Sequence, residues 1–176
     1  MAVLAETREL TGTWALDPVH STIGFELPYL AGIFRGQFRD VDAKLTADSL
    51  SGAGRVASID VKDENLMAHL QSPEFFDAER HPELTFASNS IVRTGDDLAV
   101  RGNITIRGTS KPVELAGTIA GPLADAYGRE RVNLELETTI DRTDFGLNWN
   151  IPLPNGEPAL QHEVKIVAEL FFVREA

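Results

Sequence analysis

The amino-acid sequence predicts an all-β fold, an elongated antiparallel barrel of about eight strands with one or two short helices. The main observation is a period-two alternation of apolar and polar residues, clearest from Leu98 to Arg107. Short turn sequences such as Gly95-Asp96-Asp97 separate the alternating runs, which favours hairpins and therefore antiparallel neighbours. Several runs are about ten residues long, beyond the roughly five to six of a common strand, so the predicted sheet is tall.

The alternating runs follow one another along the chain as the successive strands of this barrel. Because neighbouring side chains of a strand point to opposite faces, each run offers one face to the interior and one to solvent. The predicted strands cover residues 21–27, 34–47, 53–62, 84–92, 98–107, 113–121, 132–140 and 163–172.

One segment departs from this pattern and predicts a short helix. Residues 63–70 are rich in helix formers, and the acidic Asp63 and Glu64 suit a helix N-terminus. Pro73 follows, and proline cannot continue a helix. No linker or internal repeat interrupts the chain, so we expect one barrel domain over 13–174, preceded by an N-terminal extension over 1–12.

Composition excludes several classes of protein. The chain carries 27 Asp and Glu against 16 Lys and Arg, a formal net charge of −11, which repels nucleic-acid phosphates. It has no cysteine, so neither disulfides nor thiol chemistry is expected. No run reaches the roughly 18 apolar residues of a membrane-spanning helix. The first residues, Met1 to Glu6, lack the basic region of a signal peptide, and we expect a cytoplasmic protein.

Small residues on the predicted inward faces bear on whether the barrel is filled. They are Gly36, Ser88, Gly102, Gly117 and Ala168. An eight-stranded barrel can be packed by side chains or can hold one small ligand, and small inward residues leave volume for a ligand. The same residues suit bulges and bends of a packed barrel, and the strand pattern also suits a β-sandwich. Alternation alone leaves these alternatives open.

Reactive side chains form no recognisable catalytic or metal-binding motif. Asp17, His20 and Ser21 are close in sequence, but such neighbours cannot easily form the spatial relay of a nucleophilic triad. The four histidines are far apart and no thiolate accompanies them, so neither a metal nor a cofactor is expected. Glu26 and Asp144, together with His20, are the acid–base candidates of the alternative in which the protein is an enzyme.

Short motifs, taken in order along the chain, resemble the YceI family. In the first half they are residues 13–21 (TWALDPVHS), 24–25 (GF), 36–38 (GQF), 68–70 (AHL), 75–77 (FFD), 81–82 (HP) and 85–86 (TF). In the second half they are residues 102–108 (GNITIRG), 111–113 (KPV) and 142–146 (RTDFG). The motifs are collinear from Trp14 to Val173, so the resemblance covers nearly the whole chain.

The resemblance implies an elongated, lipocalin-like, eight-stranded antiparallel barrel that binds a polyisoprenoid or similar long lipophilic chain in its interior. It therefore favours a cavity over a packed interior. Two departures from the family pattern concern the polar contacts near the mouth. Leu66-Met67 stands where the family usually has an Arg-Asp pair, and Pro28-Tyr29 stands where a Lys-His pair is common.

We therefore expect non-catalytic binding, transport or storage of a long lipophilic ligand of the polyisoprenoid or isoprenoid-quinone type, held by apolar burial. Two rival functions stay open: an enzyme that acts on a bound lipid, and a packed barrel that serves as an interaction module. A homodimer also stays open as a partner, whereas neither nucleic acid nor a membrane-spanning segment is expected.

Large apolar side chains are the candidate ligand contacts, because they suit the wall of an apolar pocket. The residues expected to line the cavity are Phe25, Leu27, Phe34, Phe38, Phe86, Ile104, Ile106, Leu134, Leu136 and Ile166. The residues expected at its mouth are Tyr29, Phe75, Phe76 and Trp149.

Overall fold

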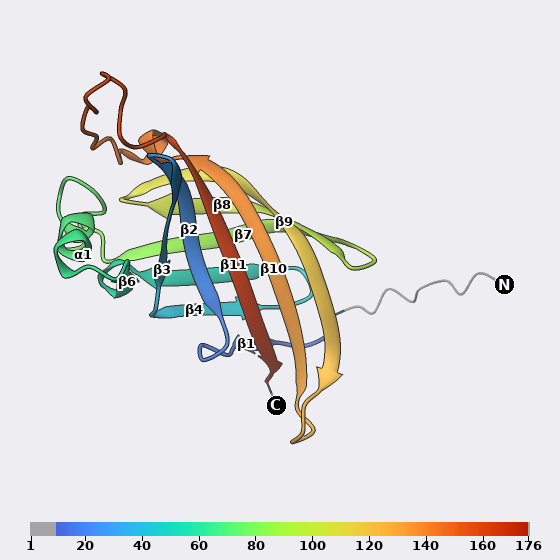
Figure 1. Ribbon diagram of the computed structural model, residues 1–176. Helices are drawn as coiled ribbons and strands as arrows, with labels where there is room; N and C mark the ends of the chain where they lie inside the picture. The colour runs from blue at the N-terminus through green and yellow to red at the C-terminus, as the bar shows by residue number, and fades with distance from the viewer. Residues whose placement is uncertain (1–9, 176) are drawn as a thin grey trace.

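The computed structural model describes residues 10–175 and confirms the antiparallel barrel (Figure 1). Of the predicted N-terminal extension, residues 1–9 lie outside the described part of the chain. The strands are β1 (Trp14–Leu16), β2 (Thr22–Tyr29), β3 (Gly32–Phe38), β4 (Val41–Leu45), β5 (Leu50–Arg55), β6 (Ile59–Asp60), β7 (Glu83–Thr94), β8 (Asp97–Ile106), β9 (Thr109–Ala124), β10 (Glu130–Asp141) and β11 (Glu163–Arg174). The helices are α1 (Glu64–Gln71) and the 3-10 turns η1 (Val56–Ser58) and η2 (Arg142–Phe145).

The strand segments form a closed ring of eight strand positions. Its order is β1-β4-β5-β7-β8-β9-β10-β11, and β11 pairs back to β1. Three of these positions hold two segments each. The segments β2, β3 and β6 continue β1, β4 and β5: β2 pairs with β11, β3 pairs with β2, and β6 pairs with β3. Pairing of β11 with β1 closes the ring, which favours the barrel over the sandwich alternative.

The predicted continuous strands over 34–47 and 53–62 are wrong in detail. The first is broken at Arg39-Asp40, and the second contains the 3-10 turn η1. Buried Val56 and Ile59 lie three residues apart, so the period of two is lost where the chain turns. Such breaks let a tall sheet bend sharply enough to close.

Helix α1 takes the place of sheet at one end of the barrel. After β5, the strand β6 pairs with β3 and not with β7. Residues 61–82, which include α1, connect β6 to β7 at this end. The helix begins as predicted, because the Asp63 side chain accepts a hydrogen bond of 2.8 Å from the Leu66 amide. In Figure 1, α1, the β2–β3 connection and the segment between η2 and β11 share this end, which we call the wide end.

A dense core fills the opposite end, which we call the closed end. Trp14 and Phe172 are completely buried there, and Val100 and Leu134 pack in the same cluster. Leu10, the first described residue, is buried against them. Burying each such side chain contributes about 1.5–3 kcal/mol, so this cluster supplies much of the stability of the barrel.

Two inward glycines do not create the cavity volume that the sequence suggested. A Cβ atom on Gly102 would lie 2.2 Å from the Ala87 carbonyl oxygen, and one on Gly117 would lie 1.7 Å from the Glu135 carbonyl oxygen. Gly102 faces Ser88, where the register of β7 and β8 shifts. At both positions glycine allows neighbouring strands to approach closely, so the bulge-and-bend alternative is correct here.

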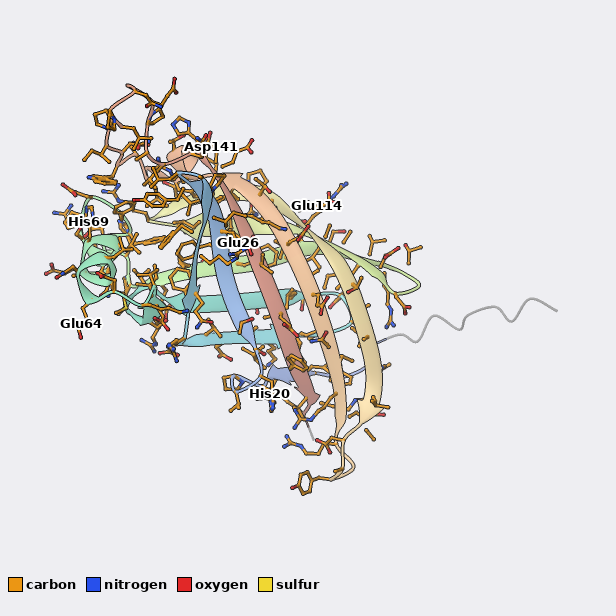
Figure 2. All side chains as sticks on the ribbon, in the orientation of Figure 1. His20, Glu26, Glu64, His69, Glu114 and Asp141 are labelled. Atoms are coloured by element: carbon orange, nitrogen blue, oxygen red, sulfur yellow. The ribbon has the colours of Figure 1, made fainter. Side chains whose placement is uncertain are left out.

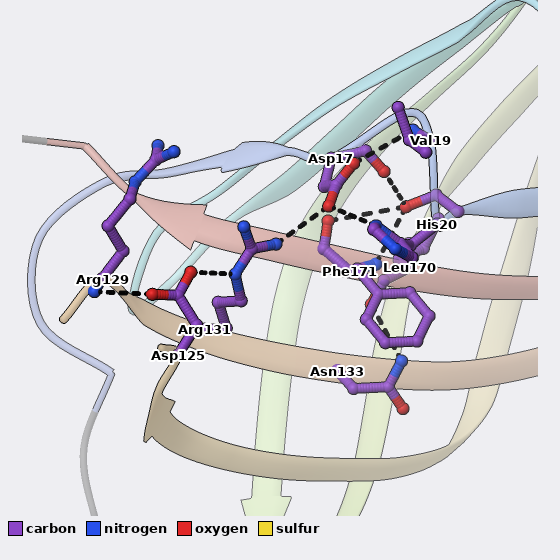
Figure 3. A network of polar contacts seen from close by, with 10 residues as sticks. Asp17, Val19, His20, Asp125, Arg129, Arg131, Asn133, Leu170 and Phe171 are labelled. Atoms are coloured by element: carbon purple, nitrogen blue, oxygen red, sulfur yellow. Dashed lines mark hydrogen bonds and ion pairs between the residues drawn. The ribbon is translucent and has the colours of Figure 1, made fainter. Parts of the chain in front are cut away.

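Figure 3 shows a polar network that ties the closed end together on its outer side. The Asp17 carboxylate accepts hydrogen bonds from the Val19 amide at 3.0 Å and from Arg131 at 2.9 Å, and it lies 2.7 Å from the His20 ring. Arg131 also donates to Asp125 at 2.7 Å. The network thereby joins the β1–β2 connection to the hairpin between β9 and β10.

These contacts hold both carboxylates in the ionised form. Burial alone would raise the pKa of Asp17, but hydrogen bonds from His20, Arg131 and the Val19 amide outweigh burial and lower it below the usual value. Hydrogen bonds from Arg131 and from the Arg129 amide lower the pKa of Asp125. The same pairing raises the pKa of Arg131.

A first prediction concerns Gly102. Gly102→Ala should lower the free energy of unfolding by about 1–3 kcal/mol, because the added methyl group overlaps the β7 backbone. Gly54→Ala is the matched control, since its Cβ would meet nothing closer than 3.7 Å, and its stability should stay within about 1 kcal/mol of wild type. Thermal and urea melts give both values. Equal stabilities for the two variants would contradict the close approach.

A second prediction concerns acid. In the unfolded chain Asp17 and Asp125 protonate near their ordinary value of 3.8, whereas the folded protein keeps them ionised to lower pH. The stability that these two carboxylates contribute to the fold is therefore fully present above about pH 4. It is lost as the pH falls through their lowered pKa values in the folded protein. Urea midpoints measured from pH 7 to pH 3 should fall less steeply in Asp125→Asn than in the exposed-site control Asp97→Asn. Identical slopes would show that the network does not carry this dependence.

Candidate ligand-binding cavity

A cavity of about 520 Å³ occupies the barrel between the closed-end core and the wide end. Its volume lies within the range of about 300–1,000 Å³ typical of small-molecule sites. The wall is almost entirely aliphatic and aromatic, and Ser51, Thr85, His69 and Arg142 are among its few polar side chains. Such a space suits an apolar molecule, because a polar one would lose its hydrogen bonds to water with few replacements.

Alternation along the strands sets this wall, as the sequence suggests. Of the fourteen predicted contact residues, thirteen lie on the wall. They are Phe25, Leu27, Tyr29, Phe34, Phe38, Phe75, Phe76, Phe86, Ile104, Ile106, Leu136, Trp149 and Ile166. Many of the strand residues among them are only half-buried although they face inward, because the cavity itself exposes them.

Leu134 is the exception, and its place in the ladder explains why. It faces inward like Leu136, but its cross-strand neighbours are the large Ile119 and Leu170. These pack Leu134 into the closed-end core, where it is completely buried. Leu136 belongs to the same cluster and is only 2% exposed, but its neighbour on β11 is the small Ala168, and its side chain reaches the cavity wall.

An aromatic cluster joins the two segments that cover the wide end. The His69 ring on α1 meets the rings of Phe75 and Trp149 edge-on, with centroids 4.9 Å away in each case. The ring centroids of Phe75 and Trp149 lie 5.4 Å apart, and His69 Nε2 lies 2.5 Å from a Glu74 carboxylate oxygen. Figure 2 shows His69 at this end. The cluster fastens the helix to the segment 147–160.

Arg142 holds that segment in place from inside the barrel. Its guanidinium group donates to the carbonyl oxygens of Leu147, Trp149 at 3.0 Å and Gln161 at 2.8 Å. Only 3% of the residue is exposed, and burial lowers its pKa, opposed by the charge of Asp141. Arginine remains charged even so, and the carbonyl dipoles replace its lost water.

Sequence reasoning missed Arg142 and most of the segment 147–160, which supplies Leu147, Leu153 and Leu160 to the wall. This segment has irregular backbone, so it carries no periodic signal that could identify its inward face. Ile23 was also missed, although it shares the alternation of Phe25 and Leu27 and that pattern could have identified it.

The acid–base candidates of the enzyme alternative lie away from the cavity wall. Glu26 pairs with Arg35 at 3.2 Å, and Asp144 is exposed beside η2. His20 lies at the closed end with 63% of its side chain exposed (Figure 2). Within residues 10–175, no cluster of three or more His, Asp or Glu residues could hold a metal ion. In the same range, no helix is long and apolar enough to cross a membrane.

The fold and cavity define a lipocalin-like ligand-binding barrel, and the comparisons assign it to a family. The YceI-like domain profile matches residues 14–172, so the chain belongs to the YceI-like domain family. A UPF0312 protein of Pseudomonas putida strain W619 is 29% identical over 157 residues, covering 83% of this chain and 82% of that protein. A UPF0312 protein of Pectobacterium carotovorum is 30% identical over 164 residues, covering 89% and 82%.

Solved structures show the same fold. BcnA of Burkholderia cenocepacia superposes with a TM-score of 0.76 at 22% identity, over 89% of this chain and 98% of that one. A polyisoprenoid binding domain from Saccharophagus degradans superposes with a TM-score of 0.71 at 12% identity, over 92% and 98%. At these identities the likeness shows the shared barrel alone.

A third prediction tests how the wide end is held. Arg142→Lys should leave buried carbonyl oxygens without donors, at a cost of about 1–3 kcal/mol each, because one ammonium group cannot reach them all. Hydrogen–deuterium exchange should then rise over residues 147–161 while β9 and β10 stay protected. Arg35→Lys is the control, because that side chain is 63% exposed. Unchanged exchange in Arg142→Lys would show that other contacts hold the segment.

Proposed function

We propose that this protein binds one long lipophilic molecule inside the barrel and carries or stores it without changing it chemically. The observation that supports this most strongly is the apolar cavity of about 520 Å³, closed at one end by packed side chains. A polyisoprenoid-type chain suits it, because such a chain is long, narrow and almost without polar atoms.

Apolar burial alone gives sufficient affinity. At about 25 cal/mol per Å², a chain that buries roughly 400 Å² of apolar surface gains on the order of 10 kcal/mol before entropy costs. The thirteen predicted residues on the wall are the proposed contacts, with Phe25, Phe86 and Ile166 inside the barrel and Tyr29 and Trp149 at the mouth. No reactive group is needed for this binding.

The family and one structural neighbour point in the same direction. The neighbour from Saccharophagus degradans is named for polyisoprenoid binding, and this chain shares its barrel. Catalysis is the second candidate function, and the positions of His20, Glu26 and Asp144 outside the cavity weigh against it. The proposed role is therefore that of a carrier or store.

A fourth prediction tests binding inside the barrel. Ala168 lies on the cavity wall, so Ala168→Phe should fill part of the void and weaken binding of a fluorescent polyprenol by about tenfold or more, while the protein stays folded. Ala116→Phe is the matched control, because Ala116 is exposed on β9, and it should bind as wild type does. Fluorescence titration and thermal melts on both variants provide the measurements.

Normal binding by a folded Ala168→Phe variant would contradict a ligand within the barrel. Conversion of the polyprenol to a new product during the titration, detected by mass spectrometry, would contradict the non-catalytic role.

A further inference from the structure

We propose that the mouth of the cavity docks on the surface of an electrically neutral lipid bilayer, from which the ligand enters. The docking surface, here called the rim, consists of residues 27–34 and 147–156. Four large apolar side chains on it are strongly exposed: Tyr29 by 46%, Leu30 by 64%, Ile33 by 54% and Ile151 by 52%. This inference rests on the proposed function, because it concerns how a lipophilic ligand reaches the cavity.

The two segments of the rim form one continuous surface. Tyr29 pairs with Leu160 as an isolated bridge, and the Ala159 amide donates to the Ile151 carbonyl oxygen at 2.9 Å. The Asn150 side chain bonds both the amide and the carbonyl group of Leu160, at 2.9 and 2.8 Å. These contacts hold the β2–β3 hairpin beside the segment 147–160, and Figure 1 shows both at the wide end.

The cavity opens within the rim. Tyr29 and Ile151 belong to the cavity wall, and both are also about half exposed to solvent. An apolar molecule that leaves a membrane here would pass from lipid to cavity wall without crossing water. If water filled a gap between membrane and mouth, the molecule would have to expose its apolar surface to water on the way, which is unfavourable.

Charge indicates which kind of membrane fits. Neither 27–34 nor 147–156 contains a charged residue, although charged residues make up 24% of the chain. The whole protein carries a formal net charge of −11, which repels anionic headgroups. The rim therefore lacks the basic residues that attract anionic membranes. Its attraction to a membrane comes from apolar contact with neutral headgroups and acyl chains.

Leu30 gives an independent sign that the rim is not shaped for stability alone. Its φ angle is +52°, in the left-handed region that favours glycine and asparagine, and its side chain points into solvent at the hairpin tip. A bulky residue rarely adopts this conformation, because its Cβ atom crowds the backbone there. The exposed leucine side chain is therefore available for apolar contact outside the barrel.

The test is association with vesicles of pure phosphatidylcholine, followed by co-sedimentation and by the fluorescence of Trp149 at the mouth. We expect wild type to bind these vesicles, to bind less when phosphatidylserine is added, and not to be released by salt. The double variant Leu30→Asn/Ile33→Glu should lower the vesicle partition coefficient by about tenfold or more. Neither residue lines the cavity, so titration with the polyprenol in solution should be unchanged.

The matched control is Val92→Glu/Leu123→Glu. These residues are exposed by 55% and 76% and lie outside the rim, so the control should bind vesicles at least half as well as wild type. Equal losses in both double variants would overturn the proposal, as would preference for phosphatidylserine. Self-association of wild type through the rim, without vesicle binding, would identify a second copy as the partner and overturn it too.

The same titrations distinguish this inference from the function on which it rests. Polyprenol binding without vesicle binding would overturn the docking surface and leave the proposed function standing. Vesicle binding without polyprenol uptake would overturn the proposed function and leave the rim as a membrane-binding surface.

Discussion

The barrel is filled unequally, with packed side chains at the closed end and a cavity toward the wide end. Trp14 and Phe172 are completely buried at the closed end, and the hydrophobic free energy gained there holds the ring together. Because that end carries the core, the wide end tolerates a void of about 520 Å³ that would otherwise weaken the fold. One set of inward side chains thus divides into a part that stabilises the barrel and a part that lines the cavity.

The wide end is built by different means, and this affects its dynamics. Helix α1 and the segment 147–160 replace sheet there, so their backbone is held by side chains such as Arg142 and by the rings of His69, Phe75 and Trp149. Such local contacts open at lower free energy than a strand ladder does. The proposed entry of a long molecule at this end requires such opening, because the molecule must pass these segments.

Period-two alternation predicted the barrel, most of its strands and the strand positions that face the cavity, because each inward position follows from its neighbours. It could not separate Leu134 from Leu136, whose neighbours on β11 are the large Leu170 and the small Ala168. Glycine was ambiguous for a related reason, since Gly102 marks a close strand approach rather than open volume. Arg142 and the segment 147–160 were not predictable from local pattern, because tertiary hydrogen bonds and ring contacts define their conformation.

We propose that the cavity holds a long lipophilic molecule in the living cell. Native mass spectrometry of the protein purified from its own host, without detergent, tests this most directly, with organic extraction to identify what is bound. We expect one extra mass per barrel, extractable into organic solvent and belonging to a single-chain, nearly apolar lipid. Protein that emerges with an empty barrel, and takes up no such lipid when supplied with it, would show that the cavity does not serve lipid binding.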